Sequence, residues 1–135
     1  MAGYSGKPLV EKLGLQPGHT VGLLNPPEHL DELLAPLPDG VQLVAGVRSR
    51  RDVVLAFFRL RTELGQKLIA MTKAIEPDGA IWVAWPKKAS KVPTDITEDV
   101  VREVALPLGL VDVKVCAIDD VWSGLRLVVR KENRR

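Results

Sequence analysis

The chain has a single cysteine, Cys116, and only two histidines among its 135 residues. One thiol cannot form an internal disulfide, and one Cys with two His is too small a set for a structural zinc site. No run of 18 apolar residues is present, and the N-terminal stretch lacks the continuous apolar segment of an export signal. These absences predict a soluble cytoplasmic protein with no disulfide framework, metal or cofactor.

An excess of charge of one sign is also missing, because 17 Asp and Glu offset 19 Lys and Arg and leave a net charge of +2. A nucleic-acid binder is expected to carry a concentrated basic stripe, and the aromatic content of 4% leaves few rings for base stacking. Nucleic-acid binding is therefore the least favoured hypothesis. The residues that would bind the nucleic acid are Arg48, Arg50, Arg51, Arg59 and Arg61.

The sequence does contain short apolar segments that alternate with amphipathic ones. Its length and its 46% hydrophobic content predict one globular α/β domain over residues 1–135. Strands are expected at 20–24, 41–45, 52–58, 80–85, 110–118 and 123–130, and helices at 8–13, 28–34, 62–75 and 95–106. This alternation is typical of a three-layer, mostly parallel sheet, and the short link before the last strand predicts an antiparallel pair at the end.

Local patterns make three of these predictions specific. The apolar positions of the longest helix recur at spacings of four, three and four, and are Leu64, Leu68, Met71 and Ile75. That spacing predicts a buried stripe against the sheet. Asp95 followed by Glu98 resembles a capping box, so Asp95 is expected to cap the helix at 95–106. The residues Glu76-Pro77-Asp78-Gly79 are typical of a turn before the strand at 80–85.

The strongest functional candidate is the basic segment from Trp85 to Lys91. It follows an apolar strand, and open α/β sheets bind ligands beyond the carboxyl ends of their strands. If the strands at 80–85 and 110–118 run parallel, the turn at 119–123 emerges at the same edge. The predicted ligand-binding residues are therefore Trp85, Lys87, Lys88, Ser90, Lys91, Asp119, Trp122 and Ser123.

Two interpretations of this segment stand. In the first, the lysines hold a small anion or nucleotide that stacks on a tryptophan and is oriented by Ser90 or Ser123. In the second, Lys and Asp side chains form surface ion pairs while the tryptophans pack in the core. The second is favoured because basic loops without glycine-rich nests usually remain hydrated.

No catalytic residue is predicted. Cys116 lies in a Val-rich strand, which favours a buried and inert thiol. Neither His19 nor His29 has a nucleophile or a carboxylate placed beside it by local sequence.

Several segments resemble known families. The segments DVVLAFF and IEPDGAIWVAW, with the strands that close the chain, resemble the carboxyl-terminal half of class I S-adenosylmethionine-dependent methyltransferases. YSGKPLVEKLGL, WPKKAS and KVCAIDDVWSGL resemble a family of small bacterial proteins of unknown function with a domain of that kind. The resemblance implies a reduced Rossmann-like fold, mostly parallel with an antiparallel C-terminal strand. It implies no established activity.

The chain departs from the methyltransferase pattern at two strand ends. Such enzymes are similar in having a glycine-rich turn after the first strand and an acidic residue after the second, which bind the cofactor. Here Asn25-Pro26-Pro27 and Ala45-Gly46 occupy those places. The link between the second and third strands has about seven residues, too few for a crossover helix. Either the second strand sits irregularly or the strand order differs from that of the enzymes.

These departures lead to two functional hypotheses besides nucleic-acid binding. The leading one is a non-catalytic Rossmann-like module that binds a protein partner or a regulatory ligand. The alternative is a protein or enzyme that binds a small anion, a nucleotide or S-adenosylmethionine through the loop from Lys87 to Lys91. Methyltransferase activity is not expected from a chain that lacks both cofactor signatures.

Overall fold

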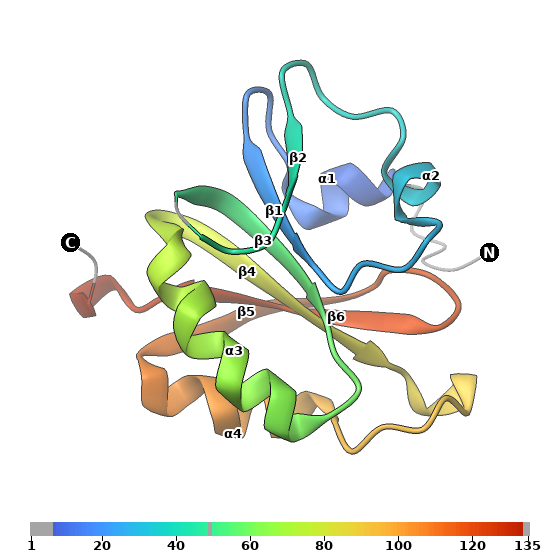
Figure 1. The fold of residues 1–135 in the computed structure, drawn as a ribbon, viewed down its shortest axis with the longest axis vertical. Helices are drawn as coiled ribbons and strands as arrows, with labels where there is room; N and C mark the ends of the chain where they lie inside the picture. The colour runs from blue at the N-terminus through green and yellow to red at the C-terminus, as the bar shows by residue number, and fades with distance from the viewer. Residues whose placement is uncertain (1–6, 49, 134–135) are drawn as a thin grey trace.

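The computed structural model describes residues 7–48 and 50–133, and a six-stranded sheet forms its centre (Figure 1). The strands lie in the order β2-β1-β3-β4-β6-β5. β1, β2, β3 and β4 are mutually parallel, whereas β6 runs antiparallel to β4 and to β5. The predicted mostly parallel sheet with an antiparallel strand near its end is confirmed. The strand bounds are β1 Thr20–Leu24, β2 Gln42–Ala45, β3 Arg51–Phe57, β4 Ile75–Pro86, β5 Leu110–Ala117 and β6 Trp122–Val129.

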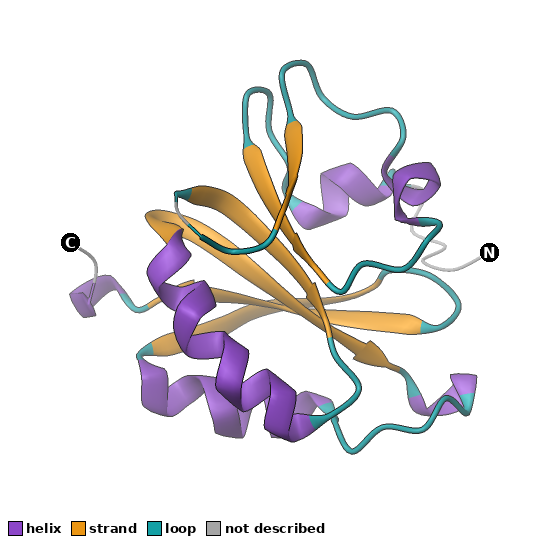
Figure 2. Cartoon of the chain, viewed as in Figure 1, coloured by secondary structure: helices purple, strands orange, loops and turns teal. Residues whose placement is uncertain are grey.

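Helices cover both faces of the sheet, which gives three layers (Figure 2). α3 (Arg61–Ala74) and α4 (Glu98–Ala105) pack on one face, and α1 (Leu9–Leu13) and α2 (Leu30–Leu34) pack on the other. Single 3-10 turns follow at Lys88–Ser90, Leu106–Leu108 and Lys131–Asn133. No helix in the described ranges is long and apolar enough to cross a bilayer.

The two faces bury separate apolar clusters. On the α3 face Leu64, Leu68 and Met71 are fully buried, as their spacing predicts. Ile75 is buried too, although it begins β4 instead of ending the helix. On the other face the indole of Trp82 is fully buried, and its Nε1 donates to the carbonyl of Leu13 at 2.9 Å, so its one polar atom is satisfied.

The link from β2 to β3 crosses the sheet without a helix. β2 and β3 both pair in parallel with β1, on opposite sides of it, so the link between them must pass over β1. A Cβ atom on Gly22 would lie 2.8 Å from the carbonyl oxygen of Gly46 and 3.0 Å from Nε of Arg51. The link therefore lies directly on Gly22 of β1, and we call its described residues 46–48 and 50 the strap. The second strand sits regularly at the sheet edge.

The structure corrects the expected cap of α4. Asp95 does not cap that helix, because its Oδ1 accepts a hydrogen bond at 2.7 Å from the amide of Arg61, the first residue of α3. The cap of α4 is Thr97, whose Oγ1 accepts from the amide of Val100 at 3.2 Å. Asp95 thus joins the loop before α4 to the start of a different helix.

The expected turn at 76–79 is also wrong, since these residues lie inside β4. The pairing of β3 with β4 jumps from Arg51 with Ile75 to Val53 with Ala80, so the extra residues form a bulge. A Cβ atom on Gly79 would lie 2.7 Å from the carbonyl oxygen of Asp52, which shows how closely the two strands approach at the bulge. The helix expected from residue 28 begins later, at Leu30.

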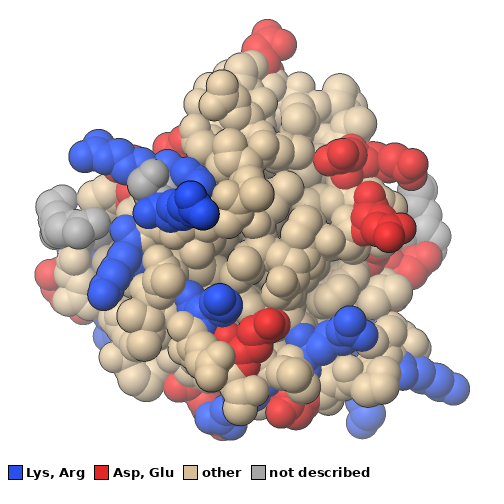
Figure 3. All heavy atoms as spheres, in the orientation of Figure 1, with Lys and Arg blue, Asp and Glu red and all other residues tan. Residues whose placement is uncertain are grey.

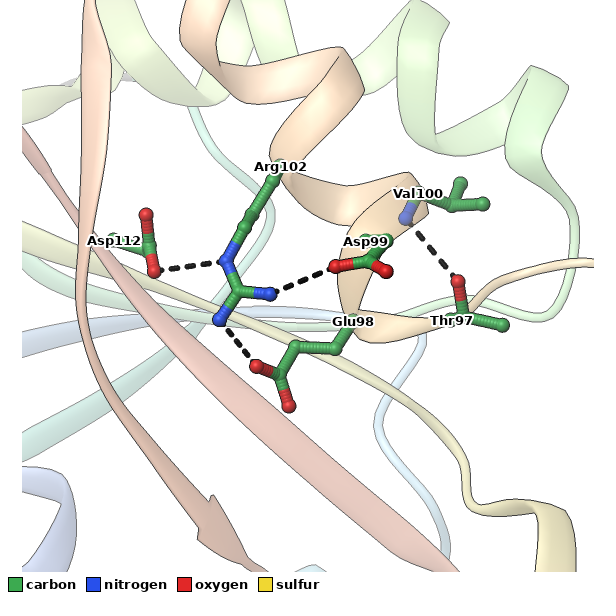
Figure 4. A network of polar contacts seen from close by, with 6 residues as sticks. All are labelled: Thr97, Glu98, Asp99, Val100, Arg102 and Asp112. Carbon is green, nitrogen blue, oxygen red and sulfur yellow. Dashed lines mark hydrogen bonds and ion pairs between the residues drawn. The ribbon is translucent and has the colours of Figure 1, made fainter.

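Arg102 fastens α4 to the edge strand β5 (Figure 4). Its guanidinium contacts Glu98, Asp99 at 3.0 Å and Asp112 of β5 at 3.0 Å. Hydrogen bonds to Asp112 and Glu98 raise the pKa of Arg102 above its ordinary value, against a smaller opposing effect of burial. This group therefore holds α4 in place beside the sheet and keeps the carboxylate of Glu98 engaged.

Candidate functional site

A cleft of about 600 Å³ opens at the carboxyl ends of β1 and β3. The connection that leaves β1 passes through α2 on one face of the sheet, whereas the connection that leaves β3 passes through α3 on the other. Open α/β sheets bind ligands where successive connections diverge in this way. We call this cavity the switch-point cleft. It is lined by Asn25, Pro26, Pro27, Phe57, Phe58, Arg59, Leu60, Glu63 and Trp122.

Aromatic rings form one wall of the switch-point cleft. The rings of Trp122 and Phe57 meet edge to face, with centroids 5.1 Å apart and planes at 87°. Phe57 is buried, and Trp122 is partly exposed. The amide of Trp122 donates to Oδ1 of Asp119 at 2.8 Å, which fixes the backbone that carries the indole. The contact with Phe57 and the hydrogen bond to Asp119 therefore fix the position of Trp122, and part of its indole stays accessible.

The turn after β1 is held in place by hydrogen bonds from the side chain of Asn25. Asn25 adopts a left-handed backbone with φ 53°, a region that Asn tolerates better than most residues. Its Nδ2 donates to the carbonyl of Phe57 at 3.1 Å and to Oε1 of Glu63 at 3.3 Å. Pro26 and Pro27 follow and have no N–H to offer. The turn is tied to β3 and α3, and it presents few backbone donors to a ligand.

The charged groups of the switch-point cleft come from the loop before α3 and from its first turn. Arg59 is exposed, and its guanidinium has no carboxylate partner among the described residues. Its backbone is fixed, because its carbonyl accepts from Oγ1 of Thr94 at 2.7 Å and from the amide of Asp95 at 3.3 Å. Next to it the side chain of Leu60 is 58% exposed. The cleft thus combines one cation, one carboxylate and one amide with aromatic and aliphatic surface.

The predicted ligand-binding residues are divided between two cavities. Trp85, Lys87, Lys88 and Lys91 come together around a second cavity of about 600 Å³, which we call the lysine pocket. Its other lining residues are Pro86, Val92, Pro93, Thr94, Ile96, Thr97 and Glu98. Trp122 lines the switch-point cleft instead, and Ser123 pairs with Trp85 in the ladder between β4 and β6.

Two predicted residues, Ser90 and Asp119, have hydrogen-bond partners within the protein. The hydroxyl of Ser90 donates to the carbonyl of Lys87 at 2.7 Å and accepts from the amide of Val92 at 3.2 Å. Asp119 accepts from the amide of Val121 at 2.8 Å and meets Nε2 of His29 at 2.7 Å. The two turns do meet at the backbone, where the amide of Lys87 donates to the carbonyl of Val121 at 2.8 Å.

The pair of His29 and Asp119 is a contact that local sequence could not reveal. The two residues are 90 positions apart, and the pair joins the start of α2 to the turn between β5 and β6. Partial burial raises the pKa of Asp119, but hydrogen bonds from His29 and from the amides of Trp122 and Val121 outweigh it. The pKa of Asp119 therefore lies below its ordinary value, and the carboxylate is ionised at neutral pH.

Sequence reasoning missed most of the switch-point cleft. Asn25, Pro26 and Pro27 stood out only as a departure from the methyltransferase pattern, and Phe57, Phe58 and Glu63 were not singled out. The rule of strand ends could have found them, had it been applied to β1 and β3 as it was to β4. Cys116 is partly buried, and burial raises the pKa of its thiol, as the expectation of an inert cysteine requires.

The five arginines named for nucleic-acid binding do not form one surface. Arg48, Arg50 and Arg51 lie at the start of β3, and Arg59 and Arg61 lie beyond its carboxyl end. Figure 3 shows basic side chains in separate groups with acidic ones between them on this face. Within residues 7–48 and 50–133, no three His, Cys, Asp or Glu side chains are grouped to hold a metal ion.

Comparison with solved structures shows methyltransferase-like folds. A S-adenosylmethionine-dependent methyltransferase from Clostridium acetobutylicum has a TM-score of 0.60 at 8% identity, over 89% of this chain and 87% of that one. A SAM dependent methyltransferase from Aquifex aeolicus has a TM-score of 0.58 at 14% identity, over 90% and 88%. The fibrillarin pre-rRNA processing protein of Methanococcus jannaschii has 0.53 at 12%, over 91% and 69%. At these identities the likeness establishes the fold alone.

Sequence comparison establishes the family. No curated protein is detectably similar. Residues 10–131 match a family described as "Protein of unknown function (DUF3052)", which takes in all six strands and nearly all of the described chain. The match agrees with the resemblance seen in the sequence to a family of unknown function with a methyltransferase-like layout. The chain therefore belongs to the DUF3052 family and has a methyltransferase-like fold.

Proposed function

We propose that this protein is a non-catalytic module that binds a small, planar, polar molecule in the switch-point cleft. The observation that carries the proposal is a cleft of about 600 Å³ at the carboxyl ends of β1 and β3. This volume lies within the range of about 300–1,000 Å³ that small-molecule sites occupy. Its position is the one where open α/β sheets bind their ligands.

The groups in the cleft favour a flat ligand with both donors and acceptors. The partly exposed ring of Trp122 offers a face or an edge for stacking. Arg59 offers donors, and Glu63 offers an acceptor beside the amide of Asn25. A nucleoside or an aromatic amino acid carries this combination of a ring with donors and acceptors.

The turn after β1 argues against use of S-adenosylmethionine as a methyl donor. A methyl-donor site needs close backbone approach and free N–H groups, and Pro26 and Pro27 supply neither. The Asn25 amide is already bonded to Phe57 and Glu63. After β2 the chain has Gly46 where a ribose-binding acid would stand, and its carbonyl accepts from Arg51. We expect no micromolar affinity for this cofactor.

The lining of the cleft also supports binding without catalysis. It includes no Ser, Thr, Cys, His or Lys, so the usual nucleophiles and the imidazole base are missing from the described wall. Glu63 is the remaining proton acceptor, and its Oε1 accepts from Asn25. These groups suit recognition of polar atoms on a bound molecule better than proton transfer.

Isothermal titration calorimetry with nucleosides, nucleotides, aromatic amino acids and S-adenosylmethionine tests the proposal. At least one planar ligand should bind, and S-adenosylmethionine should bind no more tightly than adenosine, because Pro26 and Pro27 offer no N–H groups to its methionine part. Arg59→Gln and Glu63→Gln should each weaken binding about tenfold, the loss of one charge-assisted hydrogen bond. Lys88→Gln, which alters the lysine pocket, is the matched control and should leave this binding unchanged.

Three results would contradict this proposal. One is no binding of any ligand in that set. Another is micromolar binding of S-adenosylmethionine that exceeds the binding of adenosine. The third is binding that survives Arg59→Gln and Glu63→Gln but is lost in the Lys88→Gln control.

A further inference from the structure

The lysine pocket has an apolar floor and a basic rim. Its floor includes Trp85 and Ile96, which are 7% and 2% exposed, together with Pro86. Lys88 and Lys91 are exposed, and Lys87 is partly exposed. Apolar side chains at the bottom and ammonium groups at the mouth suit a ligand that is apolar at one end and charged at the other.

The loop that carries the lysines is held in one shape by its own hydrogen bonds. The amide of Ser90 donates to Lys87 O at 3.0 Å, and the amide of Lys91 donates to Lys88 O at 3.1 Å. Lys91 has φ 61°, a left-handed conformation that is uncommon for residues other than glycine and costs about 1–2 kcal/mol. Observed backbone strain of this kind is found preferentially at ligand-binding loops. The backbone that carries the three lysines is therefore preorganised.

The three ammonium groups lack an anionic partner. Among the described residues, none of Lys87, Lys88 and Lys91 forms an ion pair. Glu98, the one acid in the lining, is engaged by Arg102. Like charges gathered at one mouth repel, and a bound anion relieves the repulsion and adds charge-assisted hydrogen bonds.

We propose that the lysine pocket binds an amphipathic anion, with a phosphate or carboxylate on Lys87, Lys88 and Lys91 and an apolar body on Trp85 and Ile96. This site is separate from the switch-point cleft, whose charges are mixed and whose lining contains none of these lysines. The two cavities approach each other at Thr94, which lines the lysine pocket and donates to the backbone carbonyl of Arg59.

Titration of the ¹⁵N-labelled 135-residue chain with phenyl phosphate, followed by NMR, tests this site. Two further probes separate its parts, because inorganic phosphate has no apolar body and benzyl alcohol has no charge. Phenyl phosphate should shift the amides of Lys88, Lys91 and Ile96 with a dissociation constant of about 1 mM or tighter. Each partial probe should bind at least about tenfold more weakly, and the affinity for phenyl phosphate should fall as salt rises.

The variant K87Q/K88Q/K91Q should bind phenyl phosphate at least about tenfold more weakly than the wild type. The matched control K67Q/K73Q/K131Q removes the same charge from exposed lysines elsewhere and should bind within about twofold. Thermal unfolding of both variants shows that each is folded.

The proposal is overturned by equal affinity in the two variants, or by no binding of phenyl phosphate to the wild type. Shifts confined to Asn25, Arg59 and Trp122 would also overturn it, since they would place the anion in the switch-point cleft. Arg59→Gln separates the two proposals, because it should weaken ligands of the cleft and leave binding to the lysine pocket unchanged.

Discussion

Replacement of Gly22 by alanine should destabilise the protein, because the strap lies where the new methyl group would go. The added Cβ would sit 2.8 Å from the carbonyl oxygen of Gly46, a backbone atom that cannot rotate away. Real Cβ contacts are longer than 3.0 Å, so the strap must shift, and its hydrogen bond from Nε of Arg51 to Gly46 would be strained with it. Overpacking of this kind costs about 1–3 kcal/mol.

Alanine's better strand propensity offsets part of that cost, by about 0.5–1 kcal/mol. The central values of the two effects leave a net loss of about 1 kcal/mol, which should lower the melting temperature by about 2–6 °C for a chain of this size. Gly65 provides the matched control, since it lies in α3 with no atom within 4 Å of an added Cβ. Gly65→Ala should stabilise the protein by about 0.8–1 kcal/mol.

Both variants can be measured by urea denaturation, with tryptophan fluorescence and far-UV circular dichroism as independent probes. The informative result is that the same Gly→Ala change has opposite signs at the two positions. If Gly22→Ala is as stable as the wild type or more stable, the link from β2 to β3 does not cross the sheet at Gly22, and the account of the strap is wrong.

Three further predictions test the core, a cap and a charge. Leu68→Ala should lower the free energy of unfolding by about 2–5 kcal/mol in chemical denaturation, because Leu68 is fully buried. Its control is Ile69→Ala, at a neighbouring site that is 48% exposed, which should change stability by less than about 0.5 kcal/mol. Similar losses in the two variants would refute the packing of α3 on the sheet. Asp95→Ala should cost about 1 kcal/mol. Hydrogen exchange should speed up in the first turn of α3, at Arg61, and faster exchange in α4 alone would refute the assigned cap. Because the folded-state pKa of Asp119 is lowered, its contribution to stability is fully present above the pKa of the unfolded carboxyl, about 3.9, and is lost as pH falls through the folded value. The stability difference between wild type and Asp119→Asn should therefore shrink from pH 6 to pH 3, and a constant difference would contradict the lowered pKa.

Local sequence patterns predicted where most helices and strands of this fold lie. The strand at 20–24 coincides with β1, and the spacing of Leu64, Leu68 and Met71 identified the buried side of α3. The short link at 119–121 correctly predicted the antiparallel pairing of the last two strands. These features depend on periodicity and turn length, which act between residues close together in the chain.

Tertiary structure decided which residues meet. The cap of α3 comes from Asp95, 34 positions after Arg61, and the partner of His29 is Asp119, 90 positions away. Both contacts depend on strand order, which short-range patterns do not encode. The register of β4 and β6 separated the predicted site, because Trp122 pairs with Pro86 and not with Trp85. Trp85 faces the α3 and α4 side, whereas Trp122 packs on Phe57 on the other side. Successive residues along a strand place their side chains on opposite faces, so residues that share one edge of the sheet can still line two different cavities.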